Sequence, residues 1–203
     1  MGSGRPAEFA AKTTIRIEIY TTNFHVSGDV EVVRWRLAEM LNSESMPSIT
    51  MQNAVREPLP ELARLAGSGL ARATPYLLVA KSAIIVAIPH EASDLASVRQ
   101  QYLSALYTER TPLTTSAIAP PFEIRGTVHL RRVGQVKLAL EELPMEFVPM
   151  SQLEGTYLLD PRLRFTAEFA VLNRPSAELF EVTGDVQSRG YGGFRQADGH
   201  PSA

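Results

Sequence analysis

The sequence has no cysteine in its 203 residues. This absence excludes a disulfide, a thiolate nucleophile, and any zinc or iron–sulfur site that depends on cysteine ligands. A chain without cysteine fits a reducing compartment, and we therefore expect a cytoplasmic location.

The sequence also lacks a strong charge of either sign. Its 20 Lys and Arg residues are balanced by 22 Asp and Glu residues, and the formal net charge is -2. A protein that covers nucleic acid through a chain-wide basic field would carry a clear positive excess. With 44% hydrophobic and 21% charged residues, the composition is that of an ordinary globular protein that can bury a core.

Long hydrophobic runs are missing as well. The longest apolar stretches, residues 76–80 and 83–89, are interrupted by Lys81 and are far too short to span a bilayer. Residues 1–12 contain no apolar segment typical of a secretory signal, and we interpret them as a flexible N-terminal arm. We therefore expect no membrane partner.

What the sequence does contain is a repeat. Residues 24–32, FHVSGDVEV, return as residues 122–130, FEIRGTVHL. Phenylalanine, a β-branched residue, glycine, valine and an aliphatic residue keep the same spacing, while the polar residues between them differ. A second match joins residues 46–54 to residues 145–153, and the separation of its two segments along the chain is one residue longer than in the first match. Self-similarity of this kind predicts two copies of one structural unit.

Each copy is predicted to be rich in strands. Residues 15–20 alternate apolar and polar side chains with the period of a half-buried strand, and residues 24–32 do so again after a turn at 21–23. Gly28 and Gly126 lie in the middle of the repeated strand, where a glycine usually marks a bulge or a close backbone approach. Five methionines, Met40, Met46, Met51, Met145 and Met150, could form an adaptable binding surface, but their strand and helix phases place most of them in the core, which is the interpretation we favour.

A short helix follows the repeated strand in each copy, over residues 36–42 in the first copy and 135–141 in the second. Each copy then ends in a predicted hairpin, formed by residues 76–88 and by residues 169–182. The copies differ most at residues 55–75 of the first copy. This insertion either carries function or is a loop segment without a function of its own.

The resulting domain division has five parts: a flexible arm at 1–12, β-rich repeat 1 at 13–89, a linking helix and Pro-containing linker at 90–120, β-rich repeat 2 at 121–183, and a disordered Gly-rich tail at 184–203. The linking helix is predicted because Leu95, Val98, Tyr102 and Leu106 form an apolar stripe at helical spacing. We expect this amphipathic helix to pack across both lobes.

These elements predict an α+β fold with two similar small lobes. Each lobe would be an antiparallel sheet or half-barrel with one short helix, and the two would be related by pseudo-twofold symmetry. Such a chain would imitate the isologous dimer that a single copy could form, because each unit alone is too small for a generous core.

The pattern can be followed through Phe24, Val26, Gly28 and Val30, then Arg36-Leu37 and Leu41-Asn42, then residues 49–54, and finally Val79-Ala80-Lys81. It resembles a family of small uncharacterised bacterial β-rich domains, here in two tandem diverged copies. The resemblance covers most of residues 15–89 and, more weakly, 121–183, where the Arg-Leu and Leu-Asn pairs are lost. It implies the fold and a bacterial source, and it implies no activity and no catalytic residue.

Side chains that carry chemistry do not form a recognisable motif. His25 and His129 lie on the outward phase of their strands, and His90-Glu91 lacks the second histidine of a zinc-protease helix because Asp94 stands there. The fourth histidine is in the tail. The glycine clusters are not phosphate cradles, and no nucleophile elbow occurs. We therefore expect no metal, no cofactor and no catalytic residue.

The tail holds the one candidate binding site. Arg189, Tyr191, Phe194 and Arg195 are interleaved with glycines, a composition typical of flexible segments that stack on bases and neutralise phosphates of single-stranded nucleic acid. Two alternatives remain for these residues. The tail is either without function, or a short docking peptide with aromatic anchors for another protein.

Together these observations favour a non-enzymatic binding or assembly module whose partner is another protein or a second copy of itself. The first alternative is a nucleic-acid-binding protein that uses its sheet faces and the Arg/Gly/aromatic tail. The second is an enzyme with a site at the lobe interface. Because the fixed positions of the repeat are packing residues and glycine, any function has to lie in what the two copies no longer share.

Overall fold

The computed structural model describes residues 12–33, 37–66, 70–90, 110–131 and 145–182, and within them the chain is mostly β-strand. The elements are β1 (Lys12–Thr21), β2 (Phe24–Val33), α1 (Leu37–Leu41), β3 (Ser48–Pro58), α2 (Pro60–Ala66), β4 (Arg72–Ala80), the 3₁₀ turn η2 (Lys81–Ala83), β5 (Ile84–His90), β6 (Arg110–Ala119), β7 (Phe122–Arg131), β8 (Phe147–Tyr157), β9 (Arg164–Asn173), the 3₁₀ turn η3 (Arg174–Ser176) and β10 (Leu179–Val182). We refer to β1–β5 as the first half and to β6–β10 as the second half.

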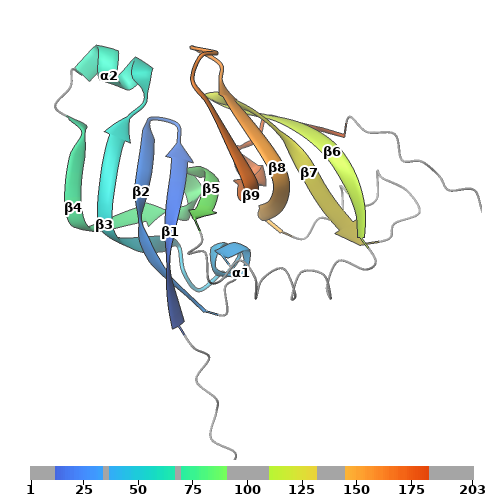
Figure 1. Cartoon of the computed structure of the whole chain (residues 1–203), viewed down its shortest axis with the longest axis horizontal. Helices are drawn as coiled ribbons and strands as arrows, with labels where there is room; N and C mark the ends of the chain where they lie inside the picture. The colour runs from blue at the N-terminus through green and yellow to red at the C-terminus, as the bar shows by residue number, and fades with distance from the viewer. Residues whose placement is uncertain (1–11, 34–36, 67–69, 91–109, 132–144, 183–203) are drawn as a thin grey trace, which may run out of the picture.

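All ten strands belong to one antiparallel sheet, in the order β10-β6-β7-β8-β9-β5-β1-β2-β3-β4 (Figure 1). Within each half, consecutive strands pair as a meander, and the fifth strand returns to lie beside the first. The two halves meet where β5 pairs with β9. The edges of the sheet are therefore β4 at one end and β10 at the other.

The predicted fold class is wrong. The described residues form a single ten-stranded sheet with two short α-helices, and not two separate α+β lobes. The reason lies in β5, where all five residues from Ile84 to Ile88 are buried. A strand that is apolar on both faces needs cover on both, and the edge of a small separate lobe cannot supply it. The pseudo-twofold relation is wrong too, because the junction joins a fifth strand to a fourth strand.

Several local predictions are confirmed. The strands predicted at 15–20 and 24–32 are part of β1 and β2, the turn between them is present, and the helix predicted at 36–42 is α1. The two predicted hairpins are wrong: β4 pairs with β3 while β5 pairs with β1 and β9, and β10 pairs with β6 instead of β9. A 3₁₀ turn carries the chain across to the far side of each half.

Other parts of the prediction concern residues that the structure does not describe. The linking helix, the helix at 135–141 and the C-terminal tail all lie outside the described residues. β6 occupies residues 110–119, which the domain division had assigned to the linker. Its alternating burial is that of a half-buried strand, and its partner β7 carries the repeated glycine.

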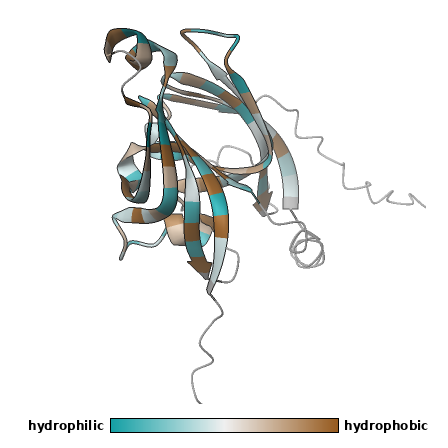
Figure 2. Ribbon diagram, turned by 60° about the vertical axis from the view of Figure 1, so that its left-hand side comes forward, coloured by the Kyte–Doolittle hydropathy of each residue, from teal (hydrophilic) through white to brown (hydrophobic). Residues whose placement is uncertain are grey.

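Alternating side chains build two cores, one under each half, and the strands in Figure 2 show the alternation as bands of brown and teal. β5 supplies both: Val86 and Ile88 pack in the core of the second half, while Ile84 and Ala87 pack in that of the first. Met51 and Met150 are buried as predicted. Met46 and Met145 are exposed, 39% and 43%, because they precede the strands whose pattern assigned them to the core.

The repeated glycine stands opposite a bulge in each half. The pairing of β2 with β3 shifts between Ser27 and Asp29, so that Gly28 faces two residues of β3, and Asn53 there has a φ of 48°. The pairing of β7 with β8 shifts in the same way at Gly126, where Gln152 has a φ of 51°. A Cβ atom on Gly28 would lie 3.0 Å from the carbonyl oxygen of Gln52. The predicted close backbone approach is confirmed in both halves.

Two asparagine side chains reinforce the junction of the halves. Asn42, just after α1, accepts a hydrogen bond from the Phe147 N–H (2.9 Å) and donates one to the Phe147 carbonyl (2.8 Å). It therefore pairs with the main chain of β8 as a neighbouring strand would. Asn173, 4% exposed at the end of β9, donates to the carbonyl of Ile84 (2.7 Å).

We expect Gly28→Ala to destabilise the fold by about 1–3 kcal/mol, because the new methyl group meets main-chain atoms that cannot rotate away. Gly126→Ala should cost less, since the nearest atom there is the flexible Met150 Cε at 3.0 Å. Chemical denaturation measures both changes. Thr14→Ala, at an exposed position on β1, is the control and should stay within about 0.5 kcal/mol of the wild type. Equal stability of Gly28→Ala and the control would contradict the packing described.

We expect Asn42→Ala to lower the free energy of unfolding by about 2 kcal/mol, because both main-chain groups of Phe147 lose their partner. Asn23→Ala, in the exposed β1–β2 turn, is the matched control and should leave stability nearly unchanged. The two free energies of unfolding are compared through the midpoints of chemical denaturation, taking the same dependence on denaturant concentration for both variants. A loss no greater than that of the control would mean that Asn42 does not hold the halves together.

Candidate functional site

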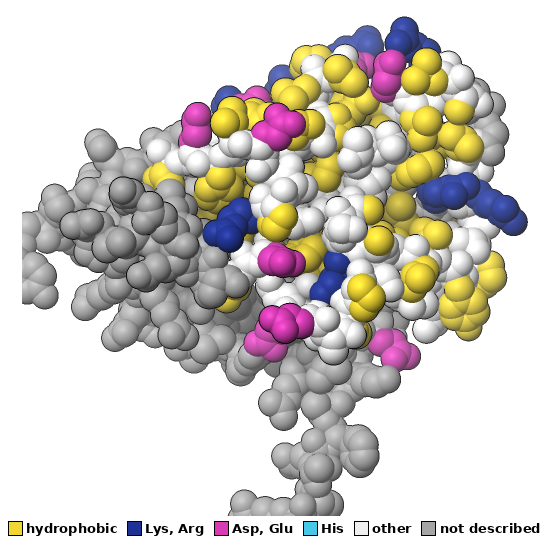
Figure 3. Space-filling model, turned by 180° about the vertical axis from the view of Figure 1, so that it is seen from behind, with side chains coloured by type: hydrophobic (Ala, Val, Ile, Leu, Met, Phe, Trp, Pro, Cys, Tyr) yellow, Lys and Arg dark blue, Asp and Glu magenta, His cyan; other side chains and the backbone are white. Residues whose placement is uncertain are grey.

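The site residues predicted from the sequence, Arg189, Tyr191, Phe194 and Arg195, lie outside the described residues. Their role in binding nucleic acid stays a prediction. On the face shown in Figure 3, the Lys and Arg side chains of the described residues stand apart from one another, with Asp and Glu side chains among them. That face therefore presents no continuous basic track along which a phosphate backbone would lie.

A cluster of titratable side chains surrounds Glu18 on β1. One carboxylate oxygen lies 3.0 Å from His90 Nε2, and the other lies 3.3 Å from His25 Nε2. His25 Nδ1 is also 3.6 Å from a carboxylate oxygen of Glu57, and the Tyr20 hydroxyl donates to Glu18 at 3.5 Å. His25 is thus half-buried between acids, whereas the sequence had placed it on an outward face. Among the described residues, no three metal-ligating side chains are placed to hold a metal ion.

Tyr20 ties this cluster to the second half of the molecule. Its ring stacks on His25 with centroids 4.8 Å apart and on Phe165 of β9 at 3.9 Å, and it meets Phe122 of β7 edge-on. Burial raises the pKa of the Tyr20 hydroxyl well above its ordinary value, and the negative charge of Glu18 and its hydrogen bond raise it further. The hydroxyl is therefore held in its protonated form, which suits a packing role.

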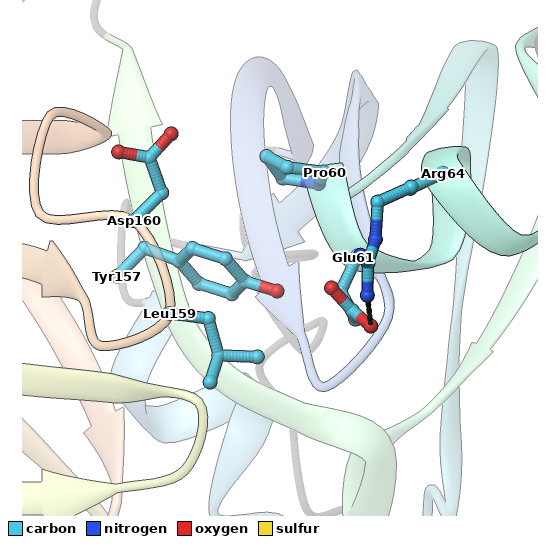
Figure 4. A pocket seen from close by; sticks show the side chains of 6 residues that line it. All are labelled: Pro60, Glu61, Arg64, Tyr157, Leu159 and Asp160. Carbon is cyan, nitrogen blue, oxygen red and sulfur yellow. Dashed lines mark hydrogen bonds and ion pairs between the residues drawn. The ribbon is translucent and has the colours of Figure 1, made fainter.

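A groove of about 580 Å³ lies between α2 and the turn that joins β8 to β9 (Figure 4). It is lined by Pro60, Glu61, Arg64, Tyr157, Leu159 and Asp160. α2 lies within residues 55–75, the stretch predicted from the sequence to be an insertion in the first half. Glu61 is paired with Arg64 at 2.7 Å, and Asp160 with Arg162 at 2.9 Å.

These ion pairs limit what the groove can do chemically. Hydrogen bonds from Arg162 hold the pKa of the Asp160 carboxyl below its ordinary range, and both carboxylates are already neutralised by a neighbour. A general acid or base needs a pKa near the working pH. Asp160 is therefore poorly suited to act as a general acid or base in this groove.

The two edges of the sheet have a different character, because they expose apolar side chains. On β4, Tyr76 is 68% exposed and Leu78 is 67% exposed, and on β10 Leu179 is 56% exposed. No described strand pairs with the outer side of β4 or β10, so a row of main-chain N–H and C=O groups lies beside these side chains. Sequence reasoning missed both edges because it took β4 and β10 for members of hairpins. The available signal was the continuous apolar run at 76–80, which favours a strand covered on both faces.

No segment described as helical is long and apolar enough to cross a membrane. Comparison of the chain with models of protein families, with curated protein sequences and with solved structures gave no match. The resemblance to small bacterial β-rich domains therefore stays a prediction.

The buried Tyr20 hydroxyl predicts a loss of stability in alkali. In the unfolded chain this group loses its proton near the ordinary pKa of 10.0, while the folded chain keeps it. The free energy of unfolding should therefore fall above pH 10.0, by up to about 1.4 kcal/mol per pH unit for one proton. Tyr20→Phe should remove this part of the slope. Tyr76→Phe, at a largely exposed ring, should keep the wild-type slope in denaturation measured across this range. Identical slopes for all three proteins would contradict the assignment.

Proposed function

We propose that the protein is a non-enzymatic assembly module of the bacterial cytoplasm, and that it binds extended protein segments along the free edges β4 and β10. The observation that carries this proposal is the exposure of Tyr76, Leu78 and Leu179 on two strands whose outer side is not paired with any described strand. The bacterial source rests on the resemblance of the repeat, and the compartment rests on the absence of cysteine.

Edge strands of this kind are suited to binding by strand addition. The main chain of the incoming segment forms the hydrogen bonds of a new ladder, and every second side chain packs on one face of the sheet. Natural edges are usually protected by charge, by proline or by a covering segment. The exposed side chains of β4 are apolar in its C-terminal half, where Tyr76 and Leu78 alternate with Leu77 and Val79, which point into the core.

The other two candidate sites support an enzyme less well. The cluster around Glu18 packs against Phe165 and Phe122 through Tyr20, and it holds the two halves together. In the groove beside α2, each carboxylate is paired with an arginine. Leu65 on α2 and Leu159 in the groove are as exposed as the side chains on the edges. The edges differ because their exposed apolar side chains lie on strands whose outer side is not paired with any described strand, so a bound segment would both form main-chain hydrogen bonds and cover apolar surface.

Photo-crosslinking in an extract of the native host tests the proposal. A photoactivatable residue at position 78 or 179 should form adducts with an extended segment of a protein, identified by mass spectrometry. The same residue at position 65, where Leu65 is 73% exposed on α2, is the matched control and should form none. Tyr76→Lys should abolish the adducts at position 78, because a charge at the edge opposes strand addition.

Adducts that are equal at positions 65, 78 and 179, or absent from both edges, would contradict edge-directed binding. The proposal does not depend on which protein the mass spectra identify. Any protein segment bound at β4 or β10 supports the proposed function.

A further inference from the structure

The two halves of the sheet have the same internal order. Read along the sheet, each runs from its fifth strand to its first, second, third and fourth strands. The glycine of the repeat anchors the comparison, since Ile17 pairs with Gly28 in the first half and Thr115 pairs with Gly126 in the second. Equivalent positions can therefore be assigned through the pairing, without reference to the sequence alignment.

The outer strands follow from this anchor. Ser48 pairs with Ala80 and Phe147 pairs with Asn173, so Ala80 of β4 corresponds to Asn173 of β9. Two residues earlier, Leu78 corresponds to Val171. In the fifth strands, Val86 pairs with Tyr20 as Leu179 pairs with Ile118, so Leu179 of β10 corresponds to Val86 of β5.

The junction inside the chain uses one edge of each kind. β5, a fifth strand, pairs with β9, a fourth strand, with Val86 opposite Leu172 and Ala87 opposite Val171. The two edges that no described strand covers are again one of each kind, namely the fourth strand β4 and the fifth strand β10. Within this molecule, the counterpart of β10, which is β5, already pairs with the counterpart of β4, which is β9.

Burial makes the comparison specific. At the junction, Val86 and Val171 are both 0% exposed. Their counterparts on the free edges, Leu179 and Leu78, are 56% and 67% exposed. On β4, Leu78 thus occupies the position that Val171 occupies on β9 at the junction. On β10, Leu179 occupies the position that Val86 occupies on β5. A matching edge would bury both.

We propose that β10 of one molecule pairs antiparallel with β4 of a second copy of this chain, with Leu179 opposite the second copy's Val79 and Phe180 opposite its Leu78. This inference rests on the proposed function and names its partner. The contact joins different edges, so it is heterologous, and each added copy offers the same two edges again. The assembly therefore grows head to tail until it closes into a ring or continues as a filament.

The contact between molecules is weaker than the junction inside the chain. Asn173 donates a buried hydrogen bond to the Ile84 carbonyl at the junction, and the corresponding residue of β4 is Ala80, which has no donor. Association is therefore reversible and depends on protein concentration.

Two singly blocked variants test the direction of pairing. Tyr76→Lys/Leu78→Lys blocks β4, and Leu179→Lys blocks β10, because charged side chains on an edge oppose pairing. Each purified variant alone should sediment as one chain of 22.3 kDa, and an equimolar mixture should give a species of two chains and nothing larger. The full wild-type chain should form larger species as its concentration rises. Leu65→Lys, at an exposed site on α2, should assemble like the wild type.

Circular dichroism and thermal unfolding of each variant establish that it is folded before its mass is interpreted. A wild-type chain that stays at 22.3 kDa at all concentrations overturns the inference. So does a blocked variant that still associates with itself, since that outcome indicates pairing of like edges. A mixture of folded variants that does not form the two-chain species overturns it as well.

A gain of affinity tests the register. Ala80→Asn, introduced into the β10-blocked chain, places an amide where Asn173 stands at the junction, within reach of the Ala177 carbonyl of the second copy. The dissociation constant of the two-chain species should fall about fivefold, the effect of one added hydrogen bond. An unchanged or higher constant overturns the register. If the purified chain does not self-associate while position 78 or 179 still cross-links to another protein, this inference fails and the proposed function stands.

Discussion

The rest of the structure depends on the pairing of β5 with β9. β5 uses both of its main-chain edges, one toward β1 and one toward β9, and its two faces lie in two different cores. Without that pairing the apolar run from Ile84 to Ile88 would lie at an open edge of the sheet. The side chains that β5 contributes to each core would then be exposed on that side. Asn42 and Asn173 add hydrogen bonds from side chain to main chain at the same junction. The ten-stranded sheet is thus held at its centre by a contact between parts of the chain that are remote in sequence.

The same junction explains why the two halves are not related by a twofold axis. A twofold would place like edges against each other, whereas here a fifth strand lies against a fourth strand. Because this contact joins two different edges, it leaves one fifth strand, β10, and one fourth strand, β4, at the ends of the sheet. The bulges opposite Gly28 and Gly126 lie at corresponding positions of the two halves, and a bulge bends the strand that carries it.

This arrangement also separates the candidate functions. The acids near the groove and in the Glu18 cluster have partners within the chain. The apolar side chains at β4 and β10 have no such partner among the described residues and gain from meeting another strand. The proposed partner, a second copy of the chain, would repeat at these edges the contact that β5 and β9 already make within one molecule.

The amino-acid sequence by itself determined the local features: the alternation in β1 and β2, the short helix α1, and the close approach at Gly28 and Gly126. Each depends on neighbours in the chain or on a glycine whose role follows from its missing Cβ. Only the tertiary structure decided that Ile84–Ile88 crosses to β1 and that Val86 meets Leu172, because pairing between strands is set by main-chain hydrogen bonds that every sequence offers alike. The apolar run at 76–80 indicates a strand that needs cover on both faces, but it does not indicate that Leu78 or Leu179 lies on a strand without a neighbour. The sequence contains the same apolar residue whether or not another strand lies beside it in the folded protein.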